Sequence, residues 1–151
     1  LKLDPTFHFM LDHYLWIQIA QRGKILHVDQ IWAAARYHAE AKNRAKTAEF
    51  GREAFRILEN VKQDKNLAPI LAQMNRRARA SAHRVDARYL LDGGRPVAAL
   101  LAWMRALFIH PPTALARLNI FASALLNLIG MGRVRAMILE NRRRKIEKKD
   151  S

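Results

Sequence analysis

Two clusters of polar residues in the first third of the chain carry side chains that can do chemistry. The first is Asp12 followed by His13, and the second is Arg36, His38 and Lys42. An aspartate near a helix N-terminus stays ionised and can take the proton of a hydroxyl as a general base. Arginine, histidine and lysine together would suit a diphosphate or a bound metal. Spacing alone leaves two plainer interpretations open: Asp12 caps a helix, and His38 is a surface residue.

The segment LDHYLWIQIAQRG, which contains the first cluster, has the pattern of a helix. Leu11, Leu15, Trp16 and Ile19 recur at helical spacing, and Gly23 is a natural stop. The acid of this segment falls in the first turn of the expected helix. There the helix dipole favours a carboxylate.

The second cluster follows a segment with a weaker pattern. Ile25, His27 and Val28 favour a short strand, and residues 31–37 are its expected partner, although three alanines there weaken the strand pattern. The two segments together predict a short β-hairpin. Because a helix and a strand that end close together would share one cleft, both polar clusters could meet there.

These segments resemble the end of the catalytic domain of family 2 glycosyltransferases, the inverting enzymes with the GT-A fold. Members of that family commonly carry a stretch of the type DYDLWLRLA, then a turn glycine, then an Arg, a His and a Lys. This chain has LDHYLWIQIA followed by GKILHVDQIWAAARYHAEAKN. Asp12 falls on the family's acid, and Leu15 and Trp16 fall on its Leu-Trp pair. Gly23 falls on the turn glycine, and Arg36, His38 and Lys42 fall on the residues of the last motif.

The resemblance implies roles for these positions. In the family the acid is the general base that deprotonates the acceptor hydroxyl, which implies that role for Asp12. The last motif implies diphosphate-side contacts for Arg36, His38 and Lys42, with His38 also on the metal side. It further implies a divalent metal, Mg²⁺ or Mn²⁺, whose main ligands lie outside this chain. The implied partners are a nucleotide-sugar donor and a glycan or lipid-linked acceptor.

The chain also departs from the family pattern. Tyr14 stands where the pattern has a second acid, Gln18 where it often has Arg, and Ala41 where it often has Ser. The sequence has no Asp-x-Asp motif and no pattern of a nucleotide-binding sheet, and a GT-A enzyme needs both. We therefore interpret residues 1–48 as the C-terminal end of a truncated GT-A catalytic domain. The chain alone is expected to be inactive.

The rest of the chain has a helical pattern throughout. Pro69 and Pro96 suit the first turns of helices, while Gly93-Gly94 and Pro111-Pro112 mark helix ends. We expect residues 49–151 to form a basic array of about five helices, which makes the whole chain mainly α.

One part of this array has the spacing of a known helical hairpin. Gly94, Ala99, Ala106 and Pro111 match the glycine, two alanines and proline of a tetratricopeptide-type hairpin. A single copy indicates a generic helical hairpin, because a self-sufficient solenoid needs about three repeats. The alternative function is therefore a non-enzymatic helical binding module.

The charge of the chain is strongly positive. There are 27 Lys and Arg against 13 Asp and Glu, which gives a net charge of +14, and there is no Cys. Such a surface attracts polyanions. The lack of Cys excludes disulfides, Cys-ligated zinc and thiol catalysis, and it fits a reducing compartment. We expect a cytoplasmic location.

The end of the chain combines apolar and basic residues. An apolar helix expected at 113–130 precedes a basic one at 133–149, which includes Arg142, Arg143, Arg144 and Lys145. These are the ingredients of peripheral docking to the anionic inner face of a membrane. A solvated helix face is the plainer interpretation. No recognised nucleic-acid motif accompanies the charge, so nucleic acid is not an expected partner.

Overall fold

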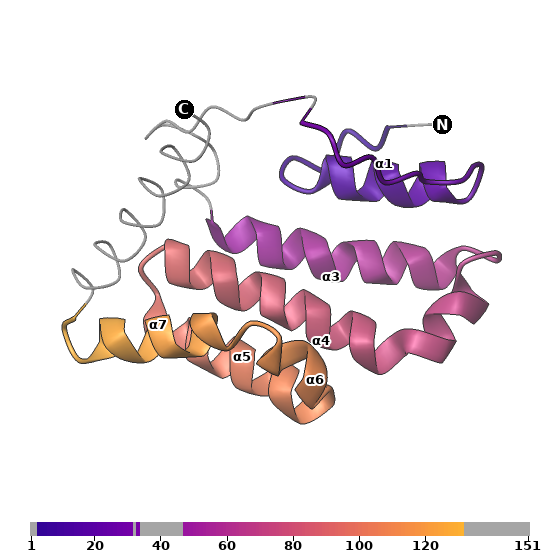
Figure 1. Cartoon of the computed structure of the whole chain (residues 1–151). Coiled ribbons are helices and arrows are strands. Elements are labelled where there is room, and N and C mark those ends of the chain that lie inside the picture. The colour runs from indigo at the N-terminus through magenta and orange to yellow at the C-terminus, as the bar shows by residue number, and fades with distance from the viewer. Residues whose placement is uncertain (1–2, 32, 34–46, 132–151) are drawn as a thin grey trace.

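The computed structural model describes residues 3–31, 33 and 47–131, and these are mainly helical, as the sequence predicts. Figure 1 shows α3 and α4 as two long helices side by side, with α1 on one side of them and α5, α6 and α7 on the other. The helices are α1 (Leu11–Ala20), α3 (Thr47–Gln63), α4 (Ala68–Asp92), α5 (Pro96–Ile109), α6 (Pro111–Leu115) and α7 (Leu118–Leu128).

The turn between α4 and α5 follows from local chemistry. Gly94 has a φ of 72°, in the left-handed region that glycine adopts without strain. Its N–H donates to the carbonyl of Leu91 at 3.1 Å, and the N–H of Arg95 donates to the carbonyl of Leu90 at 2.9 Å. These two bonds satisfy the last carbonyls of α4 in a Schellman motif. Pro96 then occupies the first turn of α5, where its missing N–H costs nothing.

The apolar helix expected at 113–130 is two helices instead. α6 ends at Leu115 and α7 begins at Leu118, because Arg117 between them has a non-helical φ of −133° and ψ of 47°. Each short helix buries its own side: Thr113 and Ala114 from α6, and Ile120 and Ala124 from α7. The nearly continuous apolar pattern of residues 113–130 is therefore divided into two helices that pack separately.

The predicted β-hairpin is not found in the described residues. Residues 24–31 form no strand, and the side chains of Ile25 and Leu26 are 69% and 84% exposed. A strand requires backbone hydrogen bonds to a partner. The expected partner at 31–37 lies almost entirely outside the described residues.

The main core lies between α4, α5, α6 and α7, and we call it the bundle core. Trp103 of α5 is its largest member, 3% exposed, and its ring centroid lies 4.8 Å from that of Phe121. Small side chains surround it and let the helices approach closely. The buried alanines of this core are Ala80, Ala87, Ala99, Ala102, Ala106, Ala114 and Ala124.

A second core joins the N-terminal segment to α3 and α4, and we call it the docking core. Phe7 and Met10 pack there against Phe50, Ala54 and Ile57 of α3. Residues on both sides of the predicted boundary at 48/49 therefore share one core.

The contact between α3 and α4 makes Gly51 sensitive to substitution. A Cβ atom at this position would overlap the carboxylate of Asp86 and would lie 2.9 Å from the Cβ of that residue. We expect Gly51→Ala to destabilise the fold, since overpacking costs about 1–3 kcal/mol while the gain in helix propensity is about 1 kcal/mol. Denaturant unfolding of Gly51→Ala, Asp86→Ala and the double variant measures this. Full additivity of the two changes would contradict the contact.

Candidate functional site

Among the predicted site residues, the structure places Asp12. Arg36, His38 and Lys42, which were predicted to lie on the diphosphate side, are outside the described residues. So does the basic group at the C-terminus, which comprises Arg142, Arg143, Arg144 and Lys145. The site is therefore described from Asp12 and from the contacts that hold its helix.

The start of α1 is held by a carboxylate from α3. Glu53 is 7% exposed and accepts hydrogen bonds from the backbone N–H groups of His8 at 2.8 Å, Phe9 at 2.9 Å and Met10 at 2.7 Å. The capping residue Met10 supplies no side-chain bond of its own. Glu53 thus satisfies, from α3, the backbone donors of the three residues that precede α1, including the N–H of the N-cap residue Met10.

The segment before α1 is fixed by a second group of contacts. Phe7 is 2% exposed, and its ring stacks on that of Tyr14 with centroids 4.9 Å apart. The guanidinium of Arg56 lies 4.2 Å from the Phe7 ring centroid. Arg56 also donates to the carboxylate of Asp4 at 3.2 Å and to the carbonyl of Thr6 at 3.2 Å. The first residues of the described chain are therefore clamped onto α3.

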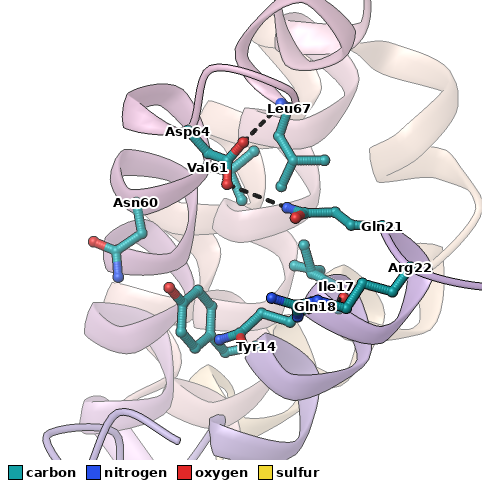
Figure 2. A pocket seen from close by; sticks show the side chains of 9 residues that line it. All are labelled: Tyr14, Ile17, Gln18, Gln21, Arg22, Asn60, Val61, Asp64 and Leu67. Atoms are coloured by element: carbon teal, nitrogen blue, oxygen red, sulfur yellow. Dashed lines mark hydrogen bonds between the residues drawn. The ribbon is translucent and has the colours of Figure 1, made fainter. Parts of the chain in front are cut away.

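The end of α1 is tied to the turn between α3 and α4. The amide of Gln21 donates to Asp64 at 3.3 Å (Figure 2). Asp64 also accepts from the backbone N–H groups of Asn66 at 2.8 Å and Leu67 at 3.1 Å. These backbone bonds hold the pKa of Asp64 below its ordinary value. Asp64 is thus an ionised residue that stabilises a turn.

An open pocket of about 380 Å³ lies between α1 and α3 beside this contact, and Figure 2 shows its lining. Its polar groups are amides, one hydroxyl, one guanidinium and the engaged carboxylate of Asp64. Among these lining residues, no side chain is placed as a nucleophile with a neighbouring base. The lining residues are Tyr14, Ile17, Gln18, Gln21, Arg22, Asn60, Val61, Asp64 and Leu67.

The opposite face of α1, which we call the outward face, carries Asp12, Trp16 and Ile19. Residues four and seven positions apart share one side of a helix. Trp16 is 57% exposed and Ile19 39% exposed, and no residue of α1 is fully buried. The apolar residues of α1 lie on every side of the helix, a pattern typical of a helix that is covered on more than one face.

Asp12 is held by its neighbour on this face. Its Oδ1 accepts the backbone N–H of His13 at 2.8 Å and lies 3.0 Å from Nδ1 of that histidine. Partial burial opposes ionisation of Asp12, but the hydrogen bonds from His13 outweigh it and lower the pKa of the carboxyl below its ordinary value. The ring of His13 lies 5.3 Å from that of Trp16. The outward face therefore presents an ionised carboxylate that can accept a proton.

The described residues do not assemble a metal site. Within residues 3–31, 33 and 47–131, no three His, Cys, Asp or Glu residues lie together as metal ligands. In the same part of the chain, no helix is long and apolar enough to cross a membrane.

Comparison of the chain with protein-family models, with curated proteins and with solved structures finds no match.

One residue of this arrangement, Glu53, was not predicted from the sequence. It is the one buried charged residue among those described. Its signal in the sequence is an acid between Phe50, Ala54 and Ile57, on the apolar side of an amphipathic helix. An acid in such a place is buried only when it has partners.

Proposed function

We propose that the chain is the C-terminal part of an inverting glycosyltransferase with Asp12 as general base. The enzyme would transfer a sugar from a nucleotide-sugar donor to the hydroxyl of a glycan or lipid-linked acceptor. The observation that carries this proposal is the outward face of α1, where an ionised Asp12 lies beside the exposed apolar side chains of Trp16 and Ile19. An uncovered face of this composition suits contact with the donor-binding part of a catalytic domain.

The proposed chemistry needs one group from this face. The acceptor oxygen attacks the anomeric carbon of the donor while Asp12 takes the hydroxyl proton. The bond from the anomeric carbon to the diphosphate oxygen breaks, and its electron pair leaves with the diphosphate. Attack from the side opposite the leaving group inverts the configuration. The hydrogen bonds from His13 orient the carboxylate of Asp12 before the reaction, so this side chain need not reorganise in the transition state.

The same proposal covers the domain, the diphosphate-side residues, the hairpin, the metal and the cellular location. Residues 1–48 are the end of the GT-A domain, with Arg36, His38 and Lys42 on the diphosphate side. A hairpin at 25–37 is assigned to the full-length enzyme, where the sheet of the donor-binding part supplies neighbouring strands. The metal is assigned to that donor-binding part, and no step described above depends on it. We place the enzyme in the cytoplasm.

The coding sequence upstream of Leu1 tests this proposal directly. We expect it to encode the alternating strand and helix pattern of a GT-A sheet and an Asp-x-Asp motif. A start codon at or just before Leu1, with no such domain ahead of it, would overturn the proposal. The encoded polypeptide should release nucleoside diphosphate from a nucleotide sugar when an acceptor is present.

A second candidate function is docking on an anionic membrane surface. The observation that favours it is a stripe on α5, which we call the α5 stripe. Val97, Leu101 and Phe108 are 58%, 56% and 76% exposed, and the exposed Arg105 shares their side of the helix. Apolar side chains interspersed with cations suit the surface of an anionic bilayer. The basic tail from Arg142 to Lys145 would add to this attraction.

Binding to lipid vesicles tests the second candidate. We expect the chain to sediment with phosphatidylserine-rich vesicles at low salt and to dissociate as ionic strength rises, because screening weakens attraction between charges. Phe108→Ser should weaken binding through lost apolar contact. Ile70→Ser is the matched control, because Ile70 is an apolar residue of α4 that is 53% exposed and lies outside the α5 stripe. Equal binding to neutral phosphatidylcholine vesicles would contradict the role of charge.

A further inference from the structure

We propose that Glu53 is a positioning residue of the transfer reaction, which sets the place of Asp12 by holding the chain just before α1. This inference rests on the proposed function, and it assigns to the helical region a part in the reaction that the sequence pattern does not indicate. The hydrogen bonds of Glu53 go to backbone groups of residues 8–10, so it acts on Asp12 through the backbone.

Glu53 lies in a rigid part of the fold. Glu53 comes from the middle of α3, which packs along α4, and its neighbours Phe50, Ala54 and Ile57 are buried in the docking core. Glu53 is itself 7% exposed. A buried, ionisable side chain with this many neighbours has few alternative positions, so its oxygen atoms are fixed relative to the bundle.

Hydrogen bonds connect Glu53 to the start of α1 through Met10. Oε2 of Glu53 accepts the N–H of Met10 at 2.7 Å. The carbonyl of Met10 accepts the N–H of Tyr14 at 3.1 Å, which is the first hydrogen bond of the α1 ladder. The helix therefore starts at a residue that Glu53 holds. Asp12 follows two residues later within the first turn, with no flexible segment between.

The contact depends on both carboxylate oxygens of Glu53. The N–H groups of His8, Phe9 and the N-cap residue Met10 converge just before α1, and three donors need more than one acceptor atom. Both oxygens of Glu53 are used, Oε1 by His8 and Oε2 by Phe9 and Met10. A glutamine has one acceptor oxygen, and its NH₂ group would face a donor. Glu53→Gln therefore keeps the size of the side chain but loses hydrogen bonding at the position of one carboxylate oxygen.

The other hydrogen bonds from this region to α3 and to the turn that follows it lie farther from Asp12 along the chain. Arg56 holds Asp4 and Thr6, and the Gln21–Asp64 bond holds the far end of α1. Glu53 is the anchor next to the first turn, so its loss should displace the base most. A displacement of about 1 Å can reduce a rate by about 100-fold.

The test compares Glu53→Gln with Glu59→Gln in the full-length enzyme. Glu59 is on the same helix, its side chain is 66% exposed, and it pairs with Lys62 at 3.9 Å, so its substitution changes charge equally. We expect Glu53→Gln to lower kcat by about 10- to 100-fold while the KM of the donor stays unchanged. The backbone amides of residues 8–10 should exchange hydrogen faster. The control should change neither quantity.

Each other result overturns a defined part of the inference. Faster exchange at residues 8–10 with an unchanged kcat would reduce Glu53 to a structural anchor. Unchanged exchange would refute the anchor itself. A wild-type enzyme that transfers no sugar, with residues 8–10 still protected, would refute the proposed function and leave the anchor in place. If Glu53→Gln does not fold, Glu53→Asp, which keeps the charge and shortens the reach, should show the same fall in kcat.

Discussion

Replacement of Asp12 with asparagine should lower the rate of sugar transfer by about 10²- to 10⁴-fold in the full-length enzyme, the range in which general base catalysis contributes. Asparagine has the size of aspartate but cannot take a proton from the acceptor hydroxyl. The side chain of Asp12 is 59% exposed and its hydrogen-bond partner is His13, so the fold should tolerate the change. Single-turnover kinetics measure the chemical step, and calorimetry with the nucleotide sugar should give an unchanged dissociation constant.

The pH dependence of the same reaction identifies the base. A base works in its deprotonated form, so the rate falls as the pH drops through its pKa. The pKa of Asp12 lies below the ordinary aspartate value, because partial burial, which would raise it, is outweighed by the hydrogen bonds from His13. The rate of the wild-type enzyme should therefore stay level through neutral pH and fall only in strong acid. A fall near neutral pH would contradict Asp12 as the base.

Two further variants complete this experiment. Asp29→Asn removes another exposed carboxylate of the same segment and should leave the rate unchanged. His13→Gln removes the partner of Asp12, and its effect should be smaller than that of Asp12→Asn if the carboxylate is the base. Unchanged turnover in Asp12→Asn would remove this residue from the mechanism.

Replacement of Phe7 with alanine should detach the N-terminal segment while the bundle stays folded. Truncation of a buried phenylalanine costs about 3–5 kcal/mol, and Phe7 also loses its stacking with Tyr14 and its contact with Arg56. These contacts belong to the docking core. Among the described residues, the bundle core around Trp103 has no members from the N-terminal segment, so this core should stay folded.

Hydrogen exchange read by mass spectrometry separates the two cores. In Phe7→Ala the amides of residues 7–21 should lose protection, and those of α5 should keep it. Trp103→Ala is the matched control, because it removes a ring of comparable burial from the other core and should expose α4, α5 and α7 together. Loss of protection along the whole chain in Phe7→Ala would show that the two cores unfold as one unit.

Local sequence was sufficient where a helix ends through chemistry within a few residues. Gly94 and Pro96 predict the turn between α4 and α5, because the left-handed φ and the missing N–H are properties of those residues alone. The break between α6 and α7 was not predictable in this way. No glycine or proline marks Ala116 and Arg117, and the break follows from burial of separate sides of the two helices.

The sequence by itself determined the mainly α class and the helix that carries Asp12. It could not determine which side of that helix packs, because the apolar residues of α1 lie on every side and their spacing favours none. Contact with α3 decided this: the docking core and Glu53, which is 43 residues from Met10 along the chain, hold one side and leave Asp12 on the other. A contact between such distant residues has no local signature, since it depends on where the folded bundle places α3.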